Sequence, residues 1–466
     1  MKKQKQMKKS VSVLIIFMAI GLAAVQAQLS GGGDLNPDLK APKEAQERFM
    51  DLRIGLSVHW GPSCLGGKEI SWSRGDSIAT EIYDNYYKQF NPINFDADEW
   101  ASLMKRWGIK YMAPTGKHHD SFTLWFSDYT EYDMENAKLP IDLMKEWARV
   151  CKENNIAFGS YYSNLDWYHP DWSPNEHGGP GQLFKTYPDS PNMERYLKFM
   201  EGQVLELITQ YGVEFIQFDG EWDDTYTHEI GAELYRKFRE ADPDVLLSTR
   251  IDKGRTFSKN HIDIDGQKYA GDYQERERVV GEGNEVFAWA DHPWQAWVTI
   301  DKGQWSYRKN TELMTIDELL LDMLSALGNN GNYMINLGPR PDGTFEPDQI
   351  ALMDQLGEWL HQHANAIYGT RGGPYYPFEH GVSTRRKNKA WLFVIKPNTQ
   401  KIELAQLKQG LQGATIFGTN QTVPFKKTEA GTLVFDLTVL EPNQTVSVIE
   451  LSYAEDIGME AKNQGK

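Results

Sequence analysis

The sequence predicts an α/β protein: an irregular (β/α)8 TIM-like barrel followed by a C-terminal antiparallel β-sandwich. Apolar runs alternate with amphipathic segments between about residues 50 and 370, which is typical of βα units around a parallel sheet. Polar and aromatic residues recur directly after these runs, as they do at the carboxyl ends of barrel strands. Beyond about residue 372, short β-like runs follow at close spacing, which predicts a sandwich.

Each expected element follows from a local pattern. Apolar runs of strand length predict barrel strands at residues 55–60, 110–115, 156–162, 214–219, 244–249, 261–265, 285–290 and 333–338. Apolar residues at three- and four-residue spacing predict helices at 96–108, 141–155, 193–212 and 348–369. Runs separated by Gly, Asn and Pro predict sandwich strands at 391–397, 401–407, 413–418, 432–437 and 445–451.

The N-terminus has the pattern of a secretory signal peptide, which we expect at residues 1–27. A basic stretch is followed by an apolar run and by the small-residue pattern Val25-Gln26-Ala27. The apolar run is short for a bilayer span of about 20 residues, so we favour cleavage over an uncleaved anchor. We therefore expect a periplasmic or secreted protein with no membrane span after cleavage. Its barrel would occupy 28–372, its sandwich 373–455 and a polar tail 456–466.

The composition narrows the possible partners. A net charge of −16 argues against nucleic acid. Fifteen Trp and 22 Tyr fit either a large aromatic core or exposed rings that stack on sugars. Cys64 and Cys151 are too few to staple a domain of this size, and the sequence does not decide whether they pair. Neither a GxGxxG nor a Walker motif suggests a cofactor. The oligomeric state stays open.

The stretch FIQFDGEWDD, residues 215–224, contains the first candidate for catalysis. Asp219 ends the fourth expected strand, and Gly220 allows a sharp turn there, so we expect the carboxylate at the mouth of the barrel. In that place it can act as a nucleophile or a base, although an Asp after a strand can also cap the next helix. Glu221, Asp223 and Asp224 crowd the same loop, and like charges in close contact would raise at least one pKa.

Other expected strand ends carry hydrogen-bonding and aromatic residues, which together are typical of a sugar pocket. Each residue alone could be structural, but their recurrence at the same end of successive strands favours a binding site. The candidates are His59, Trp60, Glu69, Trp72, His118, His119, Trp125, Tyr161, Tyr162, Arg250 and Trp294.

Two other chemistries are disfavoured. His118, His119 and Asp120 could supply metal ligands, but adjacent residues of a strand point to opposite faces. No HxH or HExxH spacing accompanies them, so we predict no metal site. The sequence also lacks the GxSxG motif of a serine hydrolase.

The chain resembles the α-L-fucosidases of glycoside hydrolase family 29. The family's His-Trp-Gly, Lys-His-His-Asp and Phe-Asp-Gly patterns are met by VHWG (58–61), KHHD (117–120) and FDGEW (218–222). Further matching segments lie at 297–307, 327–345 and 356–371. The resemblance implies an irregular (β/α)8-like barrel with a C-terminal β-sandwich. It also implies an exo-acting, cofactor-free enzyme that removes terminal α-L-fucose from glycans with retention.

The resemblance also implies roles for individual residues. Carried over by position, Asp219 is the nucleophile that forms a covalent glycosyl-enzyme. The implied sugar contacts are His59, His118 and His119, with Glu69, Tyr161 or Tyr162, and Arg250 beside them. Trp125 would pack under the apolar edge of the sugar ring.

One position departs from the family pattern. Many members have a Trp-Glu pair whose Glu serves as the acid/base, whereas this chain has Gln295 at the matching place. A glutamine amide cannot supply a proton at neutral pH. We therefore expect another carboxyl group to act, with the upstream candidates Glu275, Glu277, Glu282, Glu285 and Asp291.

Two alternative functions stay open at this point. L-Galactose differs from L-fucose by a hydroxyl on C6, which such a pocket discriminates weakly. The chain could therefore be an α-L-galactosidase that acts on an algal-type glycan, sulfated or not. It could also be a non-catalytic carbohydrate-binding homologue, which Gln295 favours and the Asp219 turn disfavours.

Overall fold

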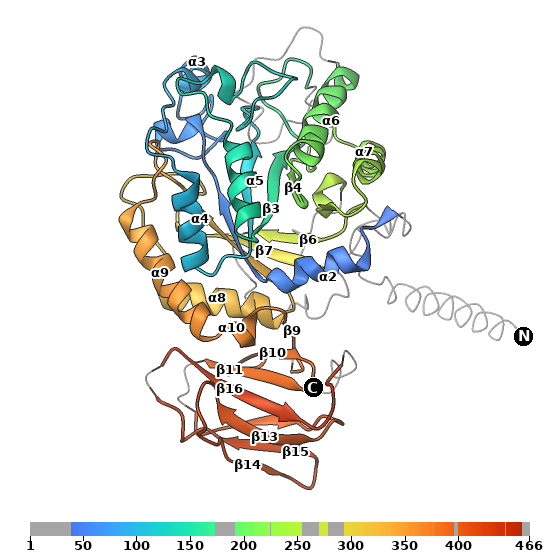
Figure 1. Ribbon diagram of the computed structural model, residues 1–466, viewed down its shortest axis with the longest axis vertical. Helices are drawn as coiled ribbons and strands as arrows, with labels where there is room; N and C mark the ends of the chain where they lie inside the picture. Colours follow the sequence, from blue (N-terminus) through green and yellow to red (C-terminus); the bar gives the residue numbers. More distant parts are fainter. Residues whose placement is uncertain are drawn as a thin grey trace, which may run out of the picture.

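The structure, a computed structural model, confirms the expected fold class (Figure 1). It describes residues 39–172, 192–223, 225–253, 270–277, 293–375, 377–395, 399–442 and 444–458. The expected signal peptide lies outside the described residues. Within them, an eight-stranded parallel sheet is followed by two antiparallel sheets.

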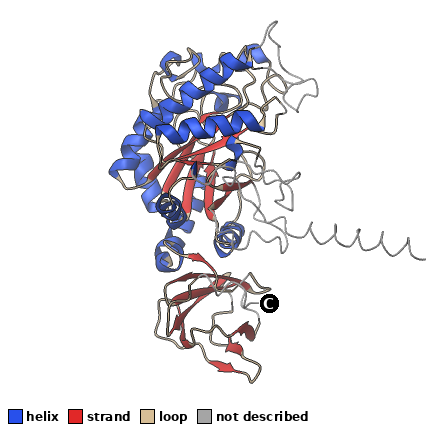
Figure 2. Cartoon of the chain, turned by 90° about the vertical axis from the view of Figure 1, so that its right-hand side faces the viewer, coloured by secondary structure: helices blue, strands red, loops and turns tan. Residues whose placement is uncertain are grey.

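Helices cover the barrel strands on the outside, as Figure 2 shows. The strands are β1 (Ile54–Val58), β2 (Tyr111–Lys117), β3 (Ala157–Ser163), β4 (Phe215–Asp219), β5 (Leu246–Leu247), β6 (Gln274–Glu277), β7 (Trp294–Thr299) and β8 (Asn332–Leu337). The helices include α4 (Ala97–Arg106), α5 (Leu143–Glu153), α6 (Met193–Thr209), α7 (His228–Ala241), α8 (Ile316–Gly328), α9 (Pro347–Gln362) and α10 (Ala364–Ile367). Polar side chains cap the first turns of five of these helices, namely Asp96, Asp142, Asn192, Thr227 and Thr315.

The sheet runs in the order β5-β4-β3-β2-β1-β8-β7-β6, with neighbouring strands parallel. Its two edges also meet. The backbone amide of Thr249 donates to the carbonyl of Tyr273 at 2.9 Å, and that of Asp272 donates to the carbonyl of Leu247 at 2.7 Å. These bonds close the barrel, so the carboxyl ends of all eight strands face one common opening.

The later strands differ from the expected ones. Residues 261–265 and 285–290 lie outside the described residues, whereas β6 and β7 occur where no strand was expected. The β6 sequence QERE has no apolar periodicity, because polar residues occupy the inward positions: Glu275 is buried and Glu277 pairs with Arg250. The expected strand 244–249 is shorter in the structure, because the chain turns after β5 into the 3-10 helix η7 (Thr249–Ile251), which carries Arg250.

Helix α2 (Lys43–Leu52) covers the amino-terminal end of the barrel. Its Phe49 ring packs against Tyr111 and Phe215, the first residues of β2 and β4, at centroid distances of 5.6 and 5.5 Å. Phe49 also contacts Tyr273, which directly precedes β6, at 5.0 Å. Aromatic burial of this kind stabilises the closed end and leaves the opposite end for chemistry.

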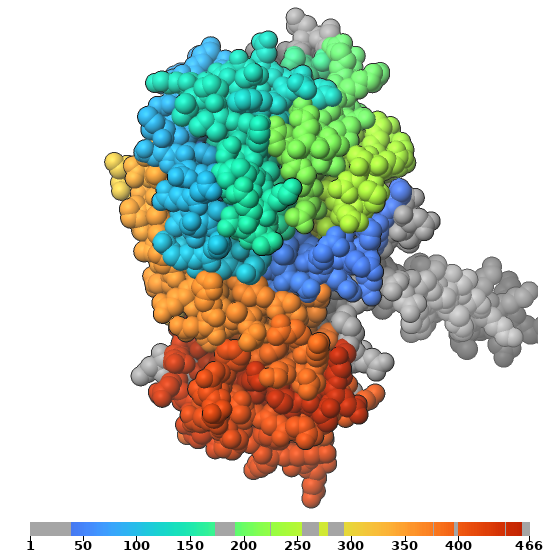
Figure 3. Space-filling view, viewed as in Figure 1, coloured from blue at the N-terminus to red at the C-terminus, as the bar shows by residue number. Residues whose placement is uncertain are grey.

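The C-terminal sandwich packs beneath the barrel, against the segment that contains α8 to α10 (Figure 3). Its larger sheet has the order β13 (Leu411–Ile416), β16 (Val446–Tyr453), β11 (Lys389–Ile395), β10 (Gly381–Arg386) and β9 (Arg371–Gly372). Its smaller sheet has the order β12 (Lys401–Ala405), β15 (Thr432–Asp436) and β14 (Phe425–Lys427). Trp391 and Phe393 of β11 join the barrel core, which ties the two parts together.

Candidate active site

A cavity of about 210 Å3 lies at the carboxyl ends of the barrel strands. It is lined by His59, Glu69, Trp72, His118, His119, Tyr161, Asp219, Trp222, Glu277, Trp297 and Trp305. A larger cavity of about 630 Å3 lies at the opposite end, beside α2. The charged residues Arg48 and Asp244 in its wall pair with each other, and none of the site residues expected from the sequence lines it. The smaller cavity is therefore the candidate active site.

Asp219 stands at the end of β4 as expected, and its two oxygens have different surroundings. Oδ1 accepts hydrogen bonds from the Gly220 amide at 2.6 Å and the Trp222 indole at 3.3 Å, and it contacts Arg250. Oδ2 accepts from the Tyr161 hydroxyl at 2.8 Å and lies 3.6 Å from Nε2 of His119. Gly220 has a φ of +91°, and a Cβ there would meet Leu165 at 2.4 Å, so this turn requires glycine.

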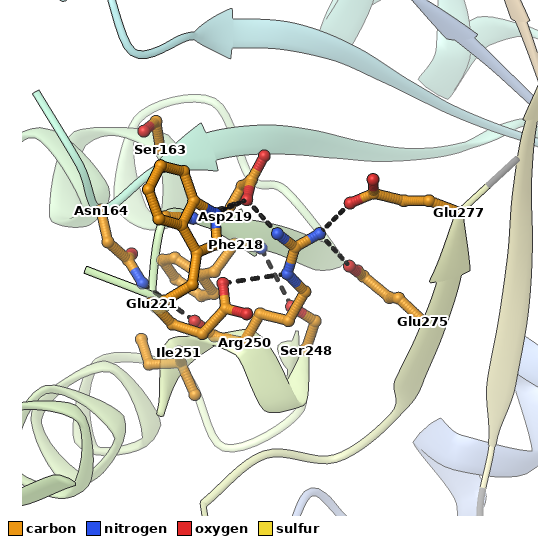
Figure 4. Close-up of polar contacts among 12 residues, drawn as sticks. Ser163, Asn164, Phe218, Asp219, Glu221, Ser248, Arg250, Ile251, Glu275 and Glu277 are labelled. Atoms are coloured by element: carbon orange, nitrogen blue, oxygen red, sulfur yellow. Dashed lines mark hydrogen bonds and ion pairs between the residues drawn. The ribbon is translucent and has the colours of Figure 1, made fainter. Parts of the chain in front are cut away.

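Arg250 joins four carboxylates beneath the cavity (Figure 4). Its guanidinium pairs with Asp219 and Glu277, donates to Glu221 at 3.0 Å, and lies 3.9 Å from Glu275. Although burial opposes the charged form, these carboxylates raise the pKa of Arg250 well above its ordinary value. The guanidinium therefore stays cationic and pairs with both Asp219 and Glu277.

The three histidines converge on the cavity from two strand ends. The His118 and His119 ring centroids are 4.2 Å apart, and the His59 ring lies 5.6 Å from that of His118. The expectation that adjacent side chains point to opposite faces is wrong here, because both histidines follow the last residue of β2 rather than lying within it. Burial lowers the pKa of His119 to about 4 and that of His118 well below the ordinary value, so both rings are neutral.

Glu69 and Trp72 reach the cavity from the loop after β1. The Glu69 carboxylate accepts hydrogen bonds from the Trp305 amide at 2.7 Å and the Ser306 hydroxyl at 2.8 Å. Burial nevertheless raises the pKa of Glu69. Trp72 is 38% exposed and stacks near Trp222, with ring centroids 6.2 Å apart, at the outer part of the site. Glu69 therefore anchors one loop, while Trp72 presents an aromatic surface to solvent.

Five expected contact residues do not line the cavity. One is Arg250, which lies beneath it, and the other four are Trp60, Trp125, Tyr162 and Trp294. Trp60 packs outside the barrel and donates from its indole to the Arg340 carbonyl, because it follows His59 and points the other way. Trp125 donates to Glu206, so the expected packing of Trp125 under a sugar ring is wrong. The Tyr162 hydroxyl donates to Gln203, and the Trp294 indole donates to the Asn329 carbonyl.

Of the expected acid/base candidates, Glu277 is the described residue that lines the cavity. Glu275 lies on the same strand but is buried in the barrel interior, where burial raises its pKa well above the ordinary value. Glu282, Glu285 and Asp291 lie outside the described residues. Gln295 is also in the barrel interior, where it accepts from the Tyr111 hydroxyl at 3.2 Å and donates to Gln217 at 3.1 Å. Position 295 therefore has no access to the cavity.

Three aromatic residues of the cavity wall were not predicted from the sequence, namely Trp222, Trp297 and Trp305. Trp222 lies in the loop after Asp219, and the other two lie in segment 297–307, which resembles the family. The spacing of these residues did not distinguish them from core residues. Trp297 and Trp305 both pack on His59, with centroid distances of 5.2 and 5.1 Å. Together they form an aromatic wall beside His59.

Among the residues that the structure describes, no group of three His, Cys, Asp or Glu side chains is arranged to hold a metal ion. No described helix is long and apolar enough to cross a membrane. Cys64 and Cys151 are both buried and unpaired with each other.

The chain is similar to known proteins in both sequence and structure. Residues 27–365 match the family model described as alpha-L-fucosidase. Tissue alpha-L-fucosidase of Rattus norvegicus is 26% identical over 386 residues, 76% of this chain and 78% of the relative. A GH29 alpha-L-fucosidase of Bacteroides thetaiotaomicron, solved as a trapped covalent intermediate with 2-fluoro-fucosyl fluoride, is 25% identical with a TM-score of 0.78; the match covers 91% of this chain and 98% of that one. Alpha-L-fucosidase isoenzyme 1 from Paenibacillus thiaminolyticus is 26% identical with a TM-score of 0.76, covering 88% and 99%.

Proposed function

The chain belongs to the alpha-L-fucosidase family of glycoside hydrolases, and we propose that it removes terminal α-L-fucose from glycans with retention, using Asp219 as nucleophile and Glu277 as acid/base. The observation that carries this proposal is that both carboxylates line one cavity and contact the same guanidinium, that of Arg250. Retaining enzymes need two carboxyl groups about 5–5.5 Å apart, and a shared guanidinium holds two carboxylates close together.

In the first step, Oδ2 of Asp219 attacks the anomeric carbon. This oxygen lies on the side of Tyr161 and His119, which line the cavity, whereas Oδ1 is held by Gly220 and Arg250. The bond from the anomeric carbon to the glycosidic oxygen breaks, and that oxygen takes a proton from Glu277. The product is a covalent glycosyl-enzyme and the free aglycone.

In the second step, water replaces the aglycone and Glu277 now acts as a base. Glu277 accepts a proton from the water, whose oxygen attacks the anomeric carbon and releases Asp219. Arg250 stays charged throughout and pairs with the carboxylate of Asp219. The two displacements together return the sugar with its original anomeric configuration.

The comparisons favour this activity over the two alternatives. The curated relatives carry the name α-L-fucosidase, and Gln295, the residue that favoured a binding protein, lies away from the cavity. Hydrolysis of 4-nitrophenyl α-L-fucoside and of the matching α-L-galactoside tests the assignment directly. We expect faster release from the fucoside and loss of release in Asp219→Asn. A preference for the galactoside would contradict the sugar assignment, and an active Asp219→Asn variant would remove Asp219 from the mechanism.

We further propose that residues 1–27 direct export of the chain and are then removed. The support is the order of a basic stretch, an apolar run and Val25-Gln26-Ala27. N-terminal sequencing of the protein recovered from an expressing bacterium tests this. A mature chain that begins at Gln28 is expected, and a chain that retains Met1 would contradict cleavage.

A further inference from the structure

The two adjacent histidines of the site each contact a serine hydroxyl through the same ring atom. Nδ1 of His118 lies 2.6 Å from Oγ of Ser71, and Nδ1 of His119 lies 2.6 Å from Oγ of Ser163. In each ring this leaves Nε2 as the nitrogen available to a ligand in the cavity. A neutral imidazole carries one proton, so the direction of each serine contact decides whether Nε2 donates or accepts.

At Ser163 the hydroxyl proton is already committed. Oγ of Ser163 lies 2.5 Å from the carbonyl oxygen of Leu165, which can only accept, so the hydroxyl donates to this carbonyl. Oγ must then accept the second hydrogen bond, which comes from Nδ1–H of His119. The neutral His119 ring consequently has an unprotonated Nε2.

The hydrogen bond between Ser71 and His118 runs in the opposite direction, from the serine to the histidine. Its Oγ accepts a hydrogen bond from the backbone amide of Asp120 at 3.0 Å. Ser71 is fully buried, and the acceptor that the structure offers to its hydroxyl proton is Nδ1 of His118. A buried hydroxyl without an acceptor is costly, so Ser71 donates to Nδ1, and the neutral His118 ring carries its proton on Nε2.

The surroundings of both rings fix this arrangement. Ser71 has a φ of +58°, which is rare for a residue with a side chain, and its amide donates to the Tyr83 hydroxyl at 2.7 Å. Tyr83 in turn donates to Asp120 at 2.5 Å. On the other side, Lys117 donates to the Ser163 carbonyl at 2.9 Å. Neither serine can therefore turn its hydroxyl without breaking buried contacts.

We propose that Ser71 and Ser163 are positioning residues that hold the neighbouring histidines in opposite tautomers, so that His118 donates a hydrogen bond to the sugar and His119 accepts one from a sugar hydroxyl. This inference rests on the proposed function, because it takes a sugar as the occupant of the cavity. It assigns a direction to each hydrogen bond. The sugar hydroxyl next to His119 must donate its proton to Nε2 of that ring. This Nε2 atom lies 3.6 Å from Oδ2 of Asp219.

Long-range 1H–15N NMR of the histidine-labelled enzyme tests the tautomers, because protonated and unprotonated ring nitrogens have distinct shifts. His118→Gln and His119→Gln assign the two rings. We expect a protonated Nε2 in His118 and an unprotonated Nε2 in His119. The same tautomer in both rings, or the reverse pattern, would overturn the proposal.

Variants of Ser163 test whether its hydroxyl sets the tautomer of His119. In Ser163→Ala we expect the His119 proton to move to Nε2, towards Asp219, and kcat/KM for the fucoside to fall by about tenfold, the scale of one hydrogen bond. Ser163→Thr keeps a hydroxyl and should restore both the shift and the rate. An unchanged His119 tautomer in Ser163→Ala would refute the role of Ser163.

Fluorinated sugars test the direction of the bond to the substrate, because fluorine cannot donate a hydrogen bond. Among L-fucose analogues with one ring hydroxyl replaced by fluorine, we expect one to bind about tenfold more weakly than L-fucose to the wild type and to lose this penalty in His119→Ala. If the His119 substitution changes no analogue's penalty, the proposal fails. A protein that binds no L-fucose would instead refute the proposed function, while the NMR shifts would still report the tautomers.

Discussion

The hydroxyl of Tyr161 donates a 2.8 Å hydrogen bond to Oδ2 of Asp219, the oxygen that we assign to attack the sugar. Tyr161 is buried and lies near the end of β3, next to β4 in the sheet. The bond therefore orients the carboxylate before substrate arrives. A hydrogen bond to a charged group of this kind is worth about 1.5–3 kcal/mol.

Tyr161→Phe should therefore lower kcat/KM for 4-nitrophenyl α-L-fucoside by about 10- to 100-fold, since about 1.4 kcal/mol corresponds to a factor of ten. Steady-state kinetics measures this. Tyr162→Phe is the matched control, because Tyr162 donates to Gln203 away from the cavity. Equal losses in both variants would mean that the Tyr161 effect is structural.

Removal of the Glu277 carboxyl group should affect substrates according to their leaving group. Glu277→Gln should lower the rate on an unactivated fucosyl disaccharide by about 10²- to 10⁴-fold, the usual contribution of a general acid. The first step with 4-nitrophenyl or fluoride leaving groups should change far less, because these leave without a proton. Pre-steady-state kinetics separates the two steps. Equal losses on both classes of substrate would assign the acid to another residue.

Restoring the family glutamate at position 295 should not create an acid. Gln295→Glu places a carboxyl group in the barrel interior beside Tyr111 and Gln217. We expect it to lower the free energy of unfolding by about 1–3 kcal/mol, the cost of a buried polar group without its partners. Urea unfolding measures this loss. Activity recovered by adding Gln295→Glu to Glu277→Gln would contradict the placement of residue 295.

Stability should depend on pH through His119. Burial, which outweighs the Asp219 carboxylate, lowers the pKa of His119 to about 4. The unfolded chain, with an ordinary histidine pKa of about 6.5, binds more protons than the fold between these values. The neutral ring therefore contributes its full stability above about pH 6.5 and loses it as the pH falls through 4.

The comparison with a non-titrating variant isolates this effect. Relative to His119→Gln, the wild type should lose up to about 1.4 kcal/mol of unfolding free energy per pH unit between about pH 6.5 and 4. Urea unfolding of both proteins at several pH values gives the difference. A difference that does not change with pH would show that His119 titrates alike in the folded and unfolded chain.

The residues that could be predicted from the sequence are those whose position follows from a strand end. Asp219 ends an apolar strand and Gly220 follows it, and the structure places Asp219 in the wall of the cavity at the carboxyl ends of the barrel strands, as expected. His118 and His119 were also identified as site residues. The expectation that their side chains point to opposite faces was wrong, because β2 ends at Lys117, one residue before His118. Side chains alternate between the two faces of a sheet only within the strand itself, and not in the residues that follow it.

Aromatic residues were the least predictable part of the site. Trp125 and Trp297 are both buried, yet one packs on α6 through Glu206 and the other lines the cavity. Composition and spacing cannot separate them, because the difference lies in how distant segments pack. The two glutamates of β6 could not be separated from the sequence either: Glu275 faces the barrel interior, whereas Glu277 lines the cavity.

The most direct test of the mechanism is the mass of the covalent intermediate. The enzyme is incubated with 2-deoxy-2-fluoro-α-L-fucosyl fluoride, digested with protease and analysed by peptide mass spectrometry, with Asp219→Asn as control. We expect one fluorofucosyl adduct on the peptide that contains Asp219, and none in the variant. An adduct on another residue, or turnover of substrate by Asp219→Asn, would contradict it.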